Sequence, residues 1–257
     1  GPAVIESMIQ TSPMGQPAGN TLRICSWNCK GLNHPIKRSK VLHHLRHLGA
    51  QIAFLQETHL KVSDQSRLRR GWVGQLYHST FHSKARGAAI LIHKSVPFVS
   101  STTILDPNGR YAIVTGHIHS TKLILTNIYA PNWDDANFFC NLFSRIPDMS
   151  SHLLVLGGDF NCWLGSLDRS SAKPTTPSKS SKIIRNFLQE FSVTDSWRFF
   201  NPTGREYSYF SRIDYLFLEK RLIPLVRSCS CNSIIISDHA PLTLDLAVGG
   251  ELNSQAP

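Results

Sequence analysis

A short apolar run followed by two glycines and an Asp-Phe-Asn triplet, at positions 153–161, limits the fold of this chain more than any other stretch. Residues 153–156 have the length and composition of a strand buried on both faces. The two glycines carry no Cβ, so they permit a turn or the close approach of another backbone. Asp159 and Asn161 would share one face of an extended chain. This pair either serves a catalytic site, as proton acceptor and amide donor, or only bonds nearby backbone in a strand-ending turn.

Hydrophobic residues make up 41 % of the 257 positions, and their even spread favours a single folded domain at residues 21–248. Residues 1–20 are expected to be a disordered arm, and the opening Gly-Pro resembles the remnant of a protease cleavage site. Residues 249–257 are expected to be a tail or a linker, which can lead to further domains in a longer protein. No apolar run has the length of a membrane span and no signal peptide is recognisable, so no membrane partner is expected.

The formal net charge of +10 suggests a polyanionic partner such as nucleic acid, although charge alone does not separate this from solubility. The six cysteines fit no zinc-binding spacing. Cys25, Cys29 and Cys162 stand in apolar, strand-like context, which favours small buried side chains over disulfide partners and indicates a reducing compartment.

Periodicity predicts a mixture of strands and amphipathic helices without internal repeats, which indicates an α/β domain with substantial antiparallel sheet. A helix is expected at 36–48, ended by Gly49, and another is expected to be capped by Asp134. Residues 68–73 and 170–181 are expected to be loops, and a third helix follows the second of these. The expected strands are 22–27, 52–55, 88–93, 111–119, 122–129, 153–156, 212–217, 233–236 and 242–248. A turn is expected at 106–109, between the strands at 88–93 and 111–119.

Polar residues stand at or beside six of these apolar strands. Each is weak on its own, since strands commonly end in polar residues, but together they offer hard oxygen ligands for Mg²⁺ and one imidazole for a charged transition state. The residues are Asn28, Glu57, Tyr129, Asp159, Asn161, Asp214, Asp238 and His239. Asp238 and His239 are neighbours that would face opposite ways on a strand, so a loop at 237–241 is expected to bring both into one site. The absence of a glycine-rich phosphate loop and of a nucleophile–base pair disfavours covalent acyl chemistry.

Six motifs occur in an order that resembles the endonuclease/exonuclease/phosphatase superfamily. They are Ser26-Trp27-Asn28, Gln56-Glu57-Thr58, Asn127-Ile128-Tyr129-Ala130-Pro131-Asn132, Gly157-Gly158-Asp159-Phe160-Asn161, Arg212-Ile213-Asp214-Tyr215 and Ser237-Asp238-His239-Ala240-Pro241. The Gly-Gly-Asp-Phe-Asn and Tyr-Ala-Pro-Asn sequences, with Gly-Leu-Asn at 31–33 and Leu-Asp-Arg-Ser at 167–170, look like the apurinic-type endonuclease domain of LINE (non-LTR) retrotransposons. The resemblance spans about residues 22–247.

This resemblance implies a four-layer α/β sandwich, in which two mixed β-sheets pack together and helices cover their outer faces. It implies that Glu57 holds Mg²⁺, for which Mn²⁺ can substitute, with Asn28 and Asp238 close by. It also implies that Ser208 and Arg169 contact the DNA backbone.

The catalytic roles that the resemblance implies belong to five residues. Asp159 would position or deprotonate the attacking water, and His239, oriented by Asp214, would stabilise the pentacovalent phosphorane. Asn161 and Tyr129 would donate hydrogen bonds to the scissile phosphate.

The chain departs from the resemblance at two places. Lys30 occupies a position where repair apurinic endonucleases usually carry an acidic residue near the metal. Residues 207–210 run directly into 211–214, whereas LINE endonucleases normally join these segments by a longer hairpin that reaches into a DNA groove. A hairpin needs at least a two-residue turn, so the local strand pairing is expected to differ here.

The expected function is a Mg²⁺-dependent endonuclease that nicks one strand of double-stranded DNA and leaves a 3′-hydroxyl. In a LINE protein that end primes reverse transcription by a downstream reverse transcriptase domain, so the nucleus is the expected site of action after synthesis in the cytoplasm. The basic balance favours DNA over small phosphate esters, with Arg86 among the candidate phosphate contacts. The alternatives are an apurinic/apyrimidinic repair endonuclease, a phosphatase for inositol or sphingolipid head groups, and a catalytically weakened DNA-binding module.

Overall fold

The computed structural model describes residues 17, 19–171 and 175–248. Most of the expected arm at 1–20 and the whole of the expected tail at 249–257 lie outside the described residues. Among the residues that are described, no helix combines the length and the apolar character that a membrane crossing requires.

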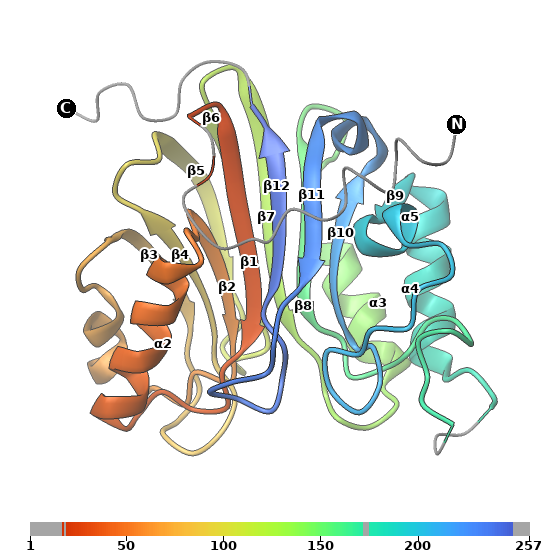
Figure 1. The fold of residues 1–257 in the computed structure, drawn as a ribbon, viewed down its shortest axis with the longest axis horizontal. Helices are drawn as coiled ribbons and strands as arrows, with labels where there is room; N and C mark the ends of the chain where they lie inside the picture. The colour runs from red at the N-terminus through yellow and green to blue at the C-terminus, as the bar shows by residue number, and fades with distance from the viewer. Residues whose placement is uncertain (1–16, 18, 172–174, 249–257) are drawn as a thin grey trace.

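Two six-stranded mixed sheets pack face to face, with helices on their outer faces (Figure 1). The first sheet has the order β11-β12-β1-β2-β4-β3 and the second has the order β5-β6-β7-β8-β10-β9. The only parallel neighbours in these two described sheets are β1 with β2 and β7 with β8. The strands are β1 (Thr21–Asn28), β2 (Ile52–Gln56), β3 (Val73–Ser79), β4 (Ala88–His93), β5 (Phe98–Leu105), β6 (Tyr111–Ile118), β7 (Thr121–Tyr129), β8 (Leu153–Asp159), β9 (Val193–Asp195), β10 (Asp214–Glu219), β11 (Val226–Cys231) and β12 (Leu242–Ala247). The expected four-layer α/β sandwich is therefore confirmed.

The helix ends are set by proline, by N-capping side chains and by glycine. Helix α2 (Pro35–His47) begins with proline, whose missing N–H needs no partner there, and it ends before Gly49, which has a left-handed φ of 73°. Asp135 accepts a hydrogen bond from Phe138 N and caps α3, and Ser178 accepts one from Ser181 N and caps α4. The other helices in the described chain are α3 (Ala136–Arg145), α4 (Lys179–Glu190), α5 (Ser196–Phe200) and the two short 3₁₀ helices η1 (Val62–Leu68) and η2 (Lys220–Leu225).

Three apolar clusters hold the layers together. Between the sheets, Ile24 and Phe54 of the first sheet pack with Leu125 and Leu216 of the second. Helix α2 covers the outer face of the first sheet, while α3 and α4 cover the second. Each fully buried side chain of this size contributes roughly 1.5–3 kcal/mol to stability.

Four strands of the described chain were not predicted from the sequence: β3, β5, β9 and β11. Each is an edge strand of its sheet and is largely exposed or only partly buried, so none carries the apolar pattern of a buried strand. The turn at 106–109 consequently joins β5 to β6, rather than residues 88–93 to 111–119 as expected. The expected loop at 68–73 is confirmed for residues 69–72, because Leu68 ends η1 and Val73 begins β3.

Three further expectations were wrong. Asp134 does not cap α3; its carboxylate instead accepts hydrogen bonds from the backbone of Lys179 and Ser180, at the start of α4. Helix α4 accordingly begins inside the expected loop at 170–181. Residues 233–236 form no strand, and two of their isoleucines are about half exposed, because β11 takes the place beside β12.

Candidate active site

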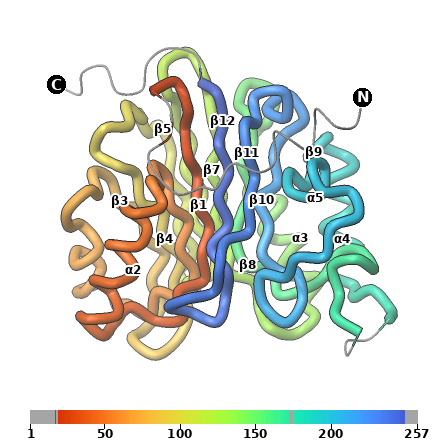
Figure 2. The backbone as a smooth tube through the Cα atoms, viewed as in Figure 1, coloured from red at the N-terminus to blue at the C-terminus, as the bar shows by residue number. Residues whose placement is uncertain are grey.

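Most of the predicted site residues meet at one end of the sandwich, because the two pairs of parallel strands end there together. Asn28, the last residue of β1, pairs with Gln56 at the end of β2. Tyr129, the last residue of β7, pairs with Asp159 at the end of β8, which in turn faces Asp214 at the start of β10. The loop between β11 and β12 folds across the last residue of β1 at the same end of the sandwich (Figure 2).

Two amide side chains fasten the sheets to each other just behind this end of the sandwich. Gln56 Nε2 donates to Asn127 Oδ1 at 2.8 Å, across from β2 to β7. Asn127 Nδ2 in turn donates to the carbonyl oxygens of Leu55 and Ala89 in the first sheet, at 3.0 and 2.9 Å. Because unpaired buried amides are costly, these bonds fix how the two sets of strand ends lie.

The glycines of β8 allow this close approach. Gly158 has a φ of 132°, and a Cβ there would lie 2.0 Å from the carbonyl oxygen of Ile128 on β7. A Cβ on Gly157 would lie 2.6 Å from Leu216 Cδ2 on β10. The close approach that the two glycines were expected to permit is therefore present at both positions.

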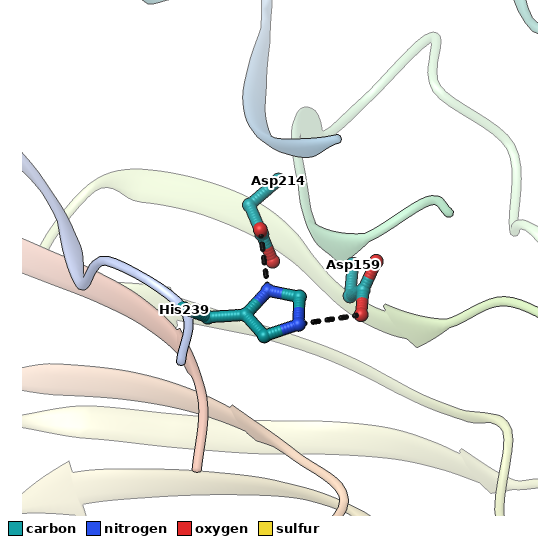
Figure 3. Close-up of side chains that lie close together, drawn as sticks. All are labelled: Asp159, Asp214 and His239. Carbon is teal, nitrogen blue, oxygen red and sulfur yellow. Dashed lines mark hydrogen bonds and ion pairs between the residues drawn. The ribbon is translucent and has the colours of Figure 1, made fainter. Parts of the chain in front are cut away.

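An Asp–His–Asp group forms the chemical centre (Figure 3). His239 Nδ1 lies 2.8 Å from Asp214 Oδ2, and His239 Nε2 lies 3.9 Å from Asp159 Oδ2. Burial opposes a charge on the imidazole, but Asp214 and then Asp159 outweigh it and raise the pKa of His239 to about 9. The imidazole is therefore protonated at neutral pH and presents its Nε2–H toward Asp159.

Asp159 is almost fully buried, at 1 % exposure. Burial and the nearby Asp214 raise the pKa of Asp159, while His239 and the amide of Asn28 oppose that shift. A carboxylate whose pKa is raised above its ordinary range is a better proton acceptor than a free aspartate.

Asn28 connects two carboxylates. Its Nδ2 donates to Glu57 Oε2 at 2.7 Å and to Asp159 Oδ2 at 2.9 Å, while its Oδ1 accepts from Lys30 N. Glu57 has a left-handed φ of 53°, a strained conformation for a residue with a Cβ, and this places the carboxylate in the cleft. Burial of the Glu57 carboxylate opposes its charge, but the His59 imidazole 3.4 Å away and the hydrogen bond from Asn28 hold the pKa of Glu57 below its ordinary value.

Tyr129 keeps its proton. Burial, followed by the charges of Glu57 and Asp159, raises the pKa of Tyr129, so the phenol remains a donor. The guanidinium of Arg110 lies 5.0 Å from the centre of the Tyr129 ring, within the range of a cation–π contact.

The loop that carries His239 is held from three directions. Ser237 Oγ donates to Asn28 O and accepts from His239 N, and Trp27 Nε1 donates to His239 O at 3.1 Å. The ring of Tyr209 stacks on the imidazole, with 4.5 Å between ring centres and 14° between planes. The expectation that residues 237–241 form a loop is thus confirmed.

These groups open into a cleft of about 570 Å³. Glu57, Tyr129, Asp159, Asn161 and His239 line one part of it, and Trp163, Tyr209, Phe210 and Ile213 supply an apolar wall. Asn161 has a left-handed φ of 50°, and its Nδ2 donates to Ala130 O. The chain is therefore not extended there, and Asp159 also bonds Asn161 N at 2.9 Å, as a strand-ending turn would.

Two expected site residues lie differently from the rest. Asp238 is exposed, and its carboxylate pairs with Lys30 rather than joining Glu57. Ser208 is only 1 % exposed, and its Oγ accepts from Ile213 N and Asp214 N, so it holds the start of β10 and presents almost no surface to DNA. Residues 207–211 form no strand, so the hairpin expected to be absent is replaced by a tight bend.

The two expected arginine contacts lie outside the cleft. Arg169 is partly exposed beside it, in a segment whose carbonyl accepts from Tyr207. Its neighbour Asp168 is buried and pairs with Arg198 and Arg212. Arg86 lines a separate hollow with Arg110 and Trp133.

Tyr209 and Ser237 were not singled out from the sequence, although both stand within or next to the motifs. Only their positions in the sequence could have indicated a role. Tyr209 follows Ser208 in the segment that lacks a hairpin, and Ser237 directly precedes Asp238 and His239. The stacking of Tyr209 on His239 depends on two loops about thirty residues apart in sequence, so no local pattern encodes it.

The donor set fits a divalent metal at Glu57. Among the described residues, Asp159, Asp214 and His239 form one group whose ligand atoms all lie within 4.8 Å. A protonated imidazole cannot donate a lone pair, however, and His239 is already bonded to Asp214. The Glu57 and Asp159 carboxylates on either side of the Asn28 amide suit Mg²⁺ better, because Mg²⁺ commonly takes one or two carboxylates and completes its shell with water and substrate phosphate.

Comparison with solved structures identifies the fold. AP endonuclease LMAP from Leishmania major superposes with a TM-score of 0.78 at 17 % identity, covering 96 % of this chain and 95 % of that one. A 3′ phosphatase, NExo, from Neisseria, bound to a product DNA hairpin, gives 0.72 at 21 % identity, covering 88 % and 99 %. The Xenopus laevis APE2 catalytic domain gives 0.74 at 18 % identity, covering 89 % and 94 %.

Comparison of sequences connects the chain to a transposon and to a family. The chain is 29 % identical over 248 residues to a Transposon TX1 uncharacterized 149 kDa protein of Xenopus laevis; the match covers 91 % of this chain and 19 % of that protein, so the chain spans about a fifth of the relative's length. The model of the Endonuclease/Exonuclease/phosphatase family matches residues 25–239, which include every strand end of the site described above. The chain belongs to the Endonuclease/Exonuclease/phosphatase family and is a hydrolase that acts on phosphate ester bonds.

Proposed function

We propose that the chain is a Mg²⁺-dependent endonuclease domain that nicks one strand of double-stranded DNA and leaves a 3′-hydroxyl and a 5′-phosphate. The observation that carries this proposal is the placement of the His239 imidazole, paired with Asp214, beside the buried Asp159 in an open cleft. A base and a fixed cation side by side match the needs of in-line attack by water on a phosphodiester.

The chain's own residues supply most of that reaction. Asp159 accepts a proton from water as the water oxygen attacks phosphorus, and the bond from phosphorus to the 3′ oxygen breaks. The 3′ oxygen leaves with the bonding pair and takes a proton from solvent. His239 offsets the negative charge that accumulates on the phosphoryl oxygens, with Asp214 holding the imidazole in place.

Tyr129 and Asn161 are proposed to bind the scissile phosphate, since both line the cleft and both are donors. A Mg²⁺ ion held by Glu57 would add Lewis-acid stabilisation of the phosphate oxygens. Asn28 keeps Glu57 and Asp159 at a fixed separation and is a positioning residue.

The relation to a transposon protein supports a place in retrotransposition. In a longer protein the 3′-hydroxyl would prime reverse transcription by a downstream domain, with the nucleus as the site of action. Repair of abasic sites is the second candidate function, favoured by the apolar cleft wall of Tyr209, Phe210 and Ile213, which could accept a sugar without a base.

Two labelled duplexes that differ only in one abasic position would test the proposal. We expect both to be nicked with Mg²⁺, the intact duplex included, and the new ends to be a 3′-hydroxyl that a polymerase extends and a 5′-phosphate. Cleavage of the abasic duplex alone would make repair the function. Binding of both duplexes with no cleavage of either would identify a DNA-binding module.

A further inference from the structure

The net positive charge of the chain lies in one part of the fold. Residues 21–105, which build β1 to β5 and α2, contain thirteen lysines and arginines but only two acidic residues, Glu57 and Asp64. Residues 106–257 contain fourteen of each and are neutral overall. This asymmetry places the electrostatic attraction for a polyanion on the side of the molecule that carries α2 (Figure 1).

Four arginines from this region converge on one groove. Arg38 and Arg46 of α2 face Arg67 and Arg70, at and just after the end of η1, across a hollow of about 300 Å³. His43 lines it as well, and Trp72 forms its floor at 5 % exposure. None of the described residues that line the hollow is acidic, and the nearby Asp64 pairs with Arg67 alone at 3.5 Å.

Arg38 is the anchor of this groove. Its side chain is buried, at 8 % exposure, and its Nη1 donates only to the carbonyl oxygens of Leu32 and Asn33. No carboxylate among the described residues forms an ion pair with it, which is uncommon for a buried guanidinium. Burial, and then the positive charges of Arg67 and Arg70, lower the pKa of Arg38 from its ordinary value, so a bound anion would relieve repulsion that is present without one.

The groove begins near the catalytic cleft. Pro35 at the start of α2 lines it, and two residues later Lys37 Nζ donates to the backbone oxygen of Lys30, which lines the cleft itself. The first turn of α2 therefore joins the two concave surfaces. A polyanion that binds in the cleft through one segment can therefore reach the arginines of the groove with the adjacent segment.

We propose that the groove formed by Arg38, Arg46, Arg67 and Arg70 is a phosphate-binding site for the backbone of duplex DNA that flanks the cleavage site. Guanidinium groups bind phosphodiester oxygens in a planar, two-pronged way and without reading base sequence. The site would therefore add affinity and fix the direction in which the duplex leaves the cleft. This inference rests on the proposed function in taking double-stranded DNA as the partner.

The test compares two matched double variants by their binding to a fluorescent duplex of about 30 base pairs, at several salt concentrations and in EDTA so that no cleavage occurs. Arg67→Ala/Arg70→Ala removes two exposed arginines of the groove. Arg185→Ala/Arg227→Ala removes two exposed arginines outside it and lowers the net charge equally. Thermal melting of each protein checks that both variants are folded.

The groove variant is expected to bind the duplex roughly tenfold more weakly than the wild type. The slope of log K against log salt should become shallower by about 2, because each lost phosphate contact changes it by about 0.9. The control variant should stay within about twofold, as exposed charges away from the contact do. Equal binding by the two variants would overturn the phosphate site while leaving the proposed function standing, whereas no binding of DNA by the wild type would remove the proposed function too.

Discussion

Lys30 and Asp238 form an ion pair at the mouth of the catalytic cleft, with 2.7 Å between Nζ and Oδ2. Both side chains are nearly half exposed, so the pair contributes little to stability. The pair affects the chemistry of the cleft in two ways. Lys30 neutralises the carboxylate of Asp238, and the Lys30 ammonium lines the same cleft as the Glu57 carboxylate that would bind a cation.

Replacing Lys30 by alanine should make Mg²⁺ bind more tightly. The change frees Asp238 and removes one positive charge, and the interaction of two unit charges roughly 4 Å apart is worth about 1 kcal/mol in water, or about fivefold in affinity. Nicking rates measured against Mg²⁺ concentration, together with calorimetric titration of Mn²⁺, would measure the shift. Lys37→Ala is the control, since it removes a neighbouring charge and leaves the pair intact. If the Mg²⁺ concentration for half-maximal nicking does not fall in Lys30→Ala, the Lys30–Asp238 pair does not weaken Mg²⁺ binding.

Tyr209 should matter through its ring and not its hydroxyl. Stacking against a protonated imidazole is worth about 1–2 kcal/mol when partly buried, so Tyr209→Leu should lower the pKa of His239 by up to about one unit. Because a fall of one unit from a pKa of about 9 leaves the His239 imidazole mostly protonated at pH 7, we expect the nicking rate of Tyr209→Leu to fall below the wild-type rate mainly near pH 9, while Tyr209→Phe stays near the wild type. The His239 titration followed by NMR in EDTA reports the pKa directly; an unchanged titration in the leucine variant would show that the stacking does not act on the charge.

Gly158→Ala should destabilise the protein by more than about 3 kcal/mol, because it combines an unfavourable φ with a backbone clash. Gly165→Ala is the control, since a Cβ there meets only Asp168 Oδ2 at an ordinary 3.5 Å. Urea unfolding of both variants would measure the difference. A Gly158→Ala protein as stable as the control would mean that β7 and β8 can move apart at the site.

His78 should make the protein sensitive to mild acid. Burial lowers the pKa of His78 to about 4, and its Nε2 lies 2.7 Å from Thr58 Oγ1. Between the unfolded value of about 6.5 and the folded value, only the unfolded chain takes up the proton, so stability falls as the pH falls. The loss at pH 5 should be about 2 kcal/mol from this residue.

His78→Gln removes that titration and keeps a side chain able to bond Thr58. Urea unfolding at pH 7 and pH 5 should therefore show a smaller acid-induced loss in the variant than in the wild type. Equal losses would mean that His78 is charged within the folded protein.

Most of the central chemistry was predictable because four of its residues stand at the end or the start of an apolar strand. Asn28, Tyr129, Asp159 and Asp214 follow from the periodicity of β1, β7, β8 and β10 once the order of motifs is recognised. Strands that are buried on both faces place their polar residues mainly at the strand ends, and a site can form where several such ends meet. The two-sheet sandwich followed from the same resemblance.

The features that were not predicted from the sequence lie in loops and in edge strands. Lys30 pairs with Asp238 across 208 positions, and only the path of the loop after β11 brings them together. The edge strands β3 and β5 pair on one side only, so their sequences tolerate polar and exposed residues and show no buried-strand pattern. Ser208 shows how a residue type suited to contacting phosphate can hold backbone amides: its Oγ accepts from Ile213 N and Asp214 N.

Conversion of supercoiled plasmid to the open circular form, with Mg²⁺, tests the proposed nuclease activity most directly. The wild type should nick the plasmid, and Asp159→Ala, His239→Ala and addition of EDTA should each reduce the rate by at least about a hundredfold. Nicking that persists at the wild-type rate in Asp159→Ala and His239→Ala, with both variants folded, would contradict the assignment of this cleft as the catalytic centre.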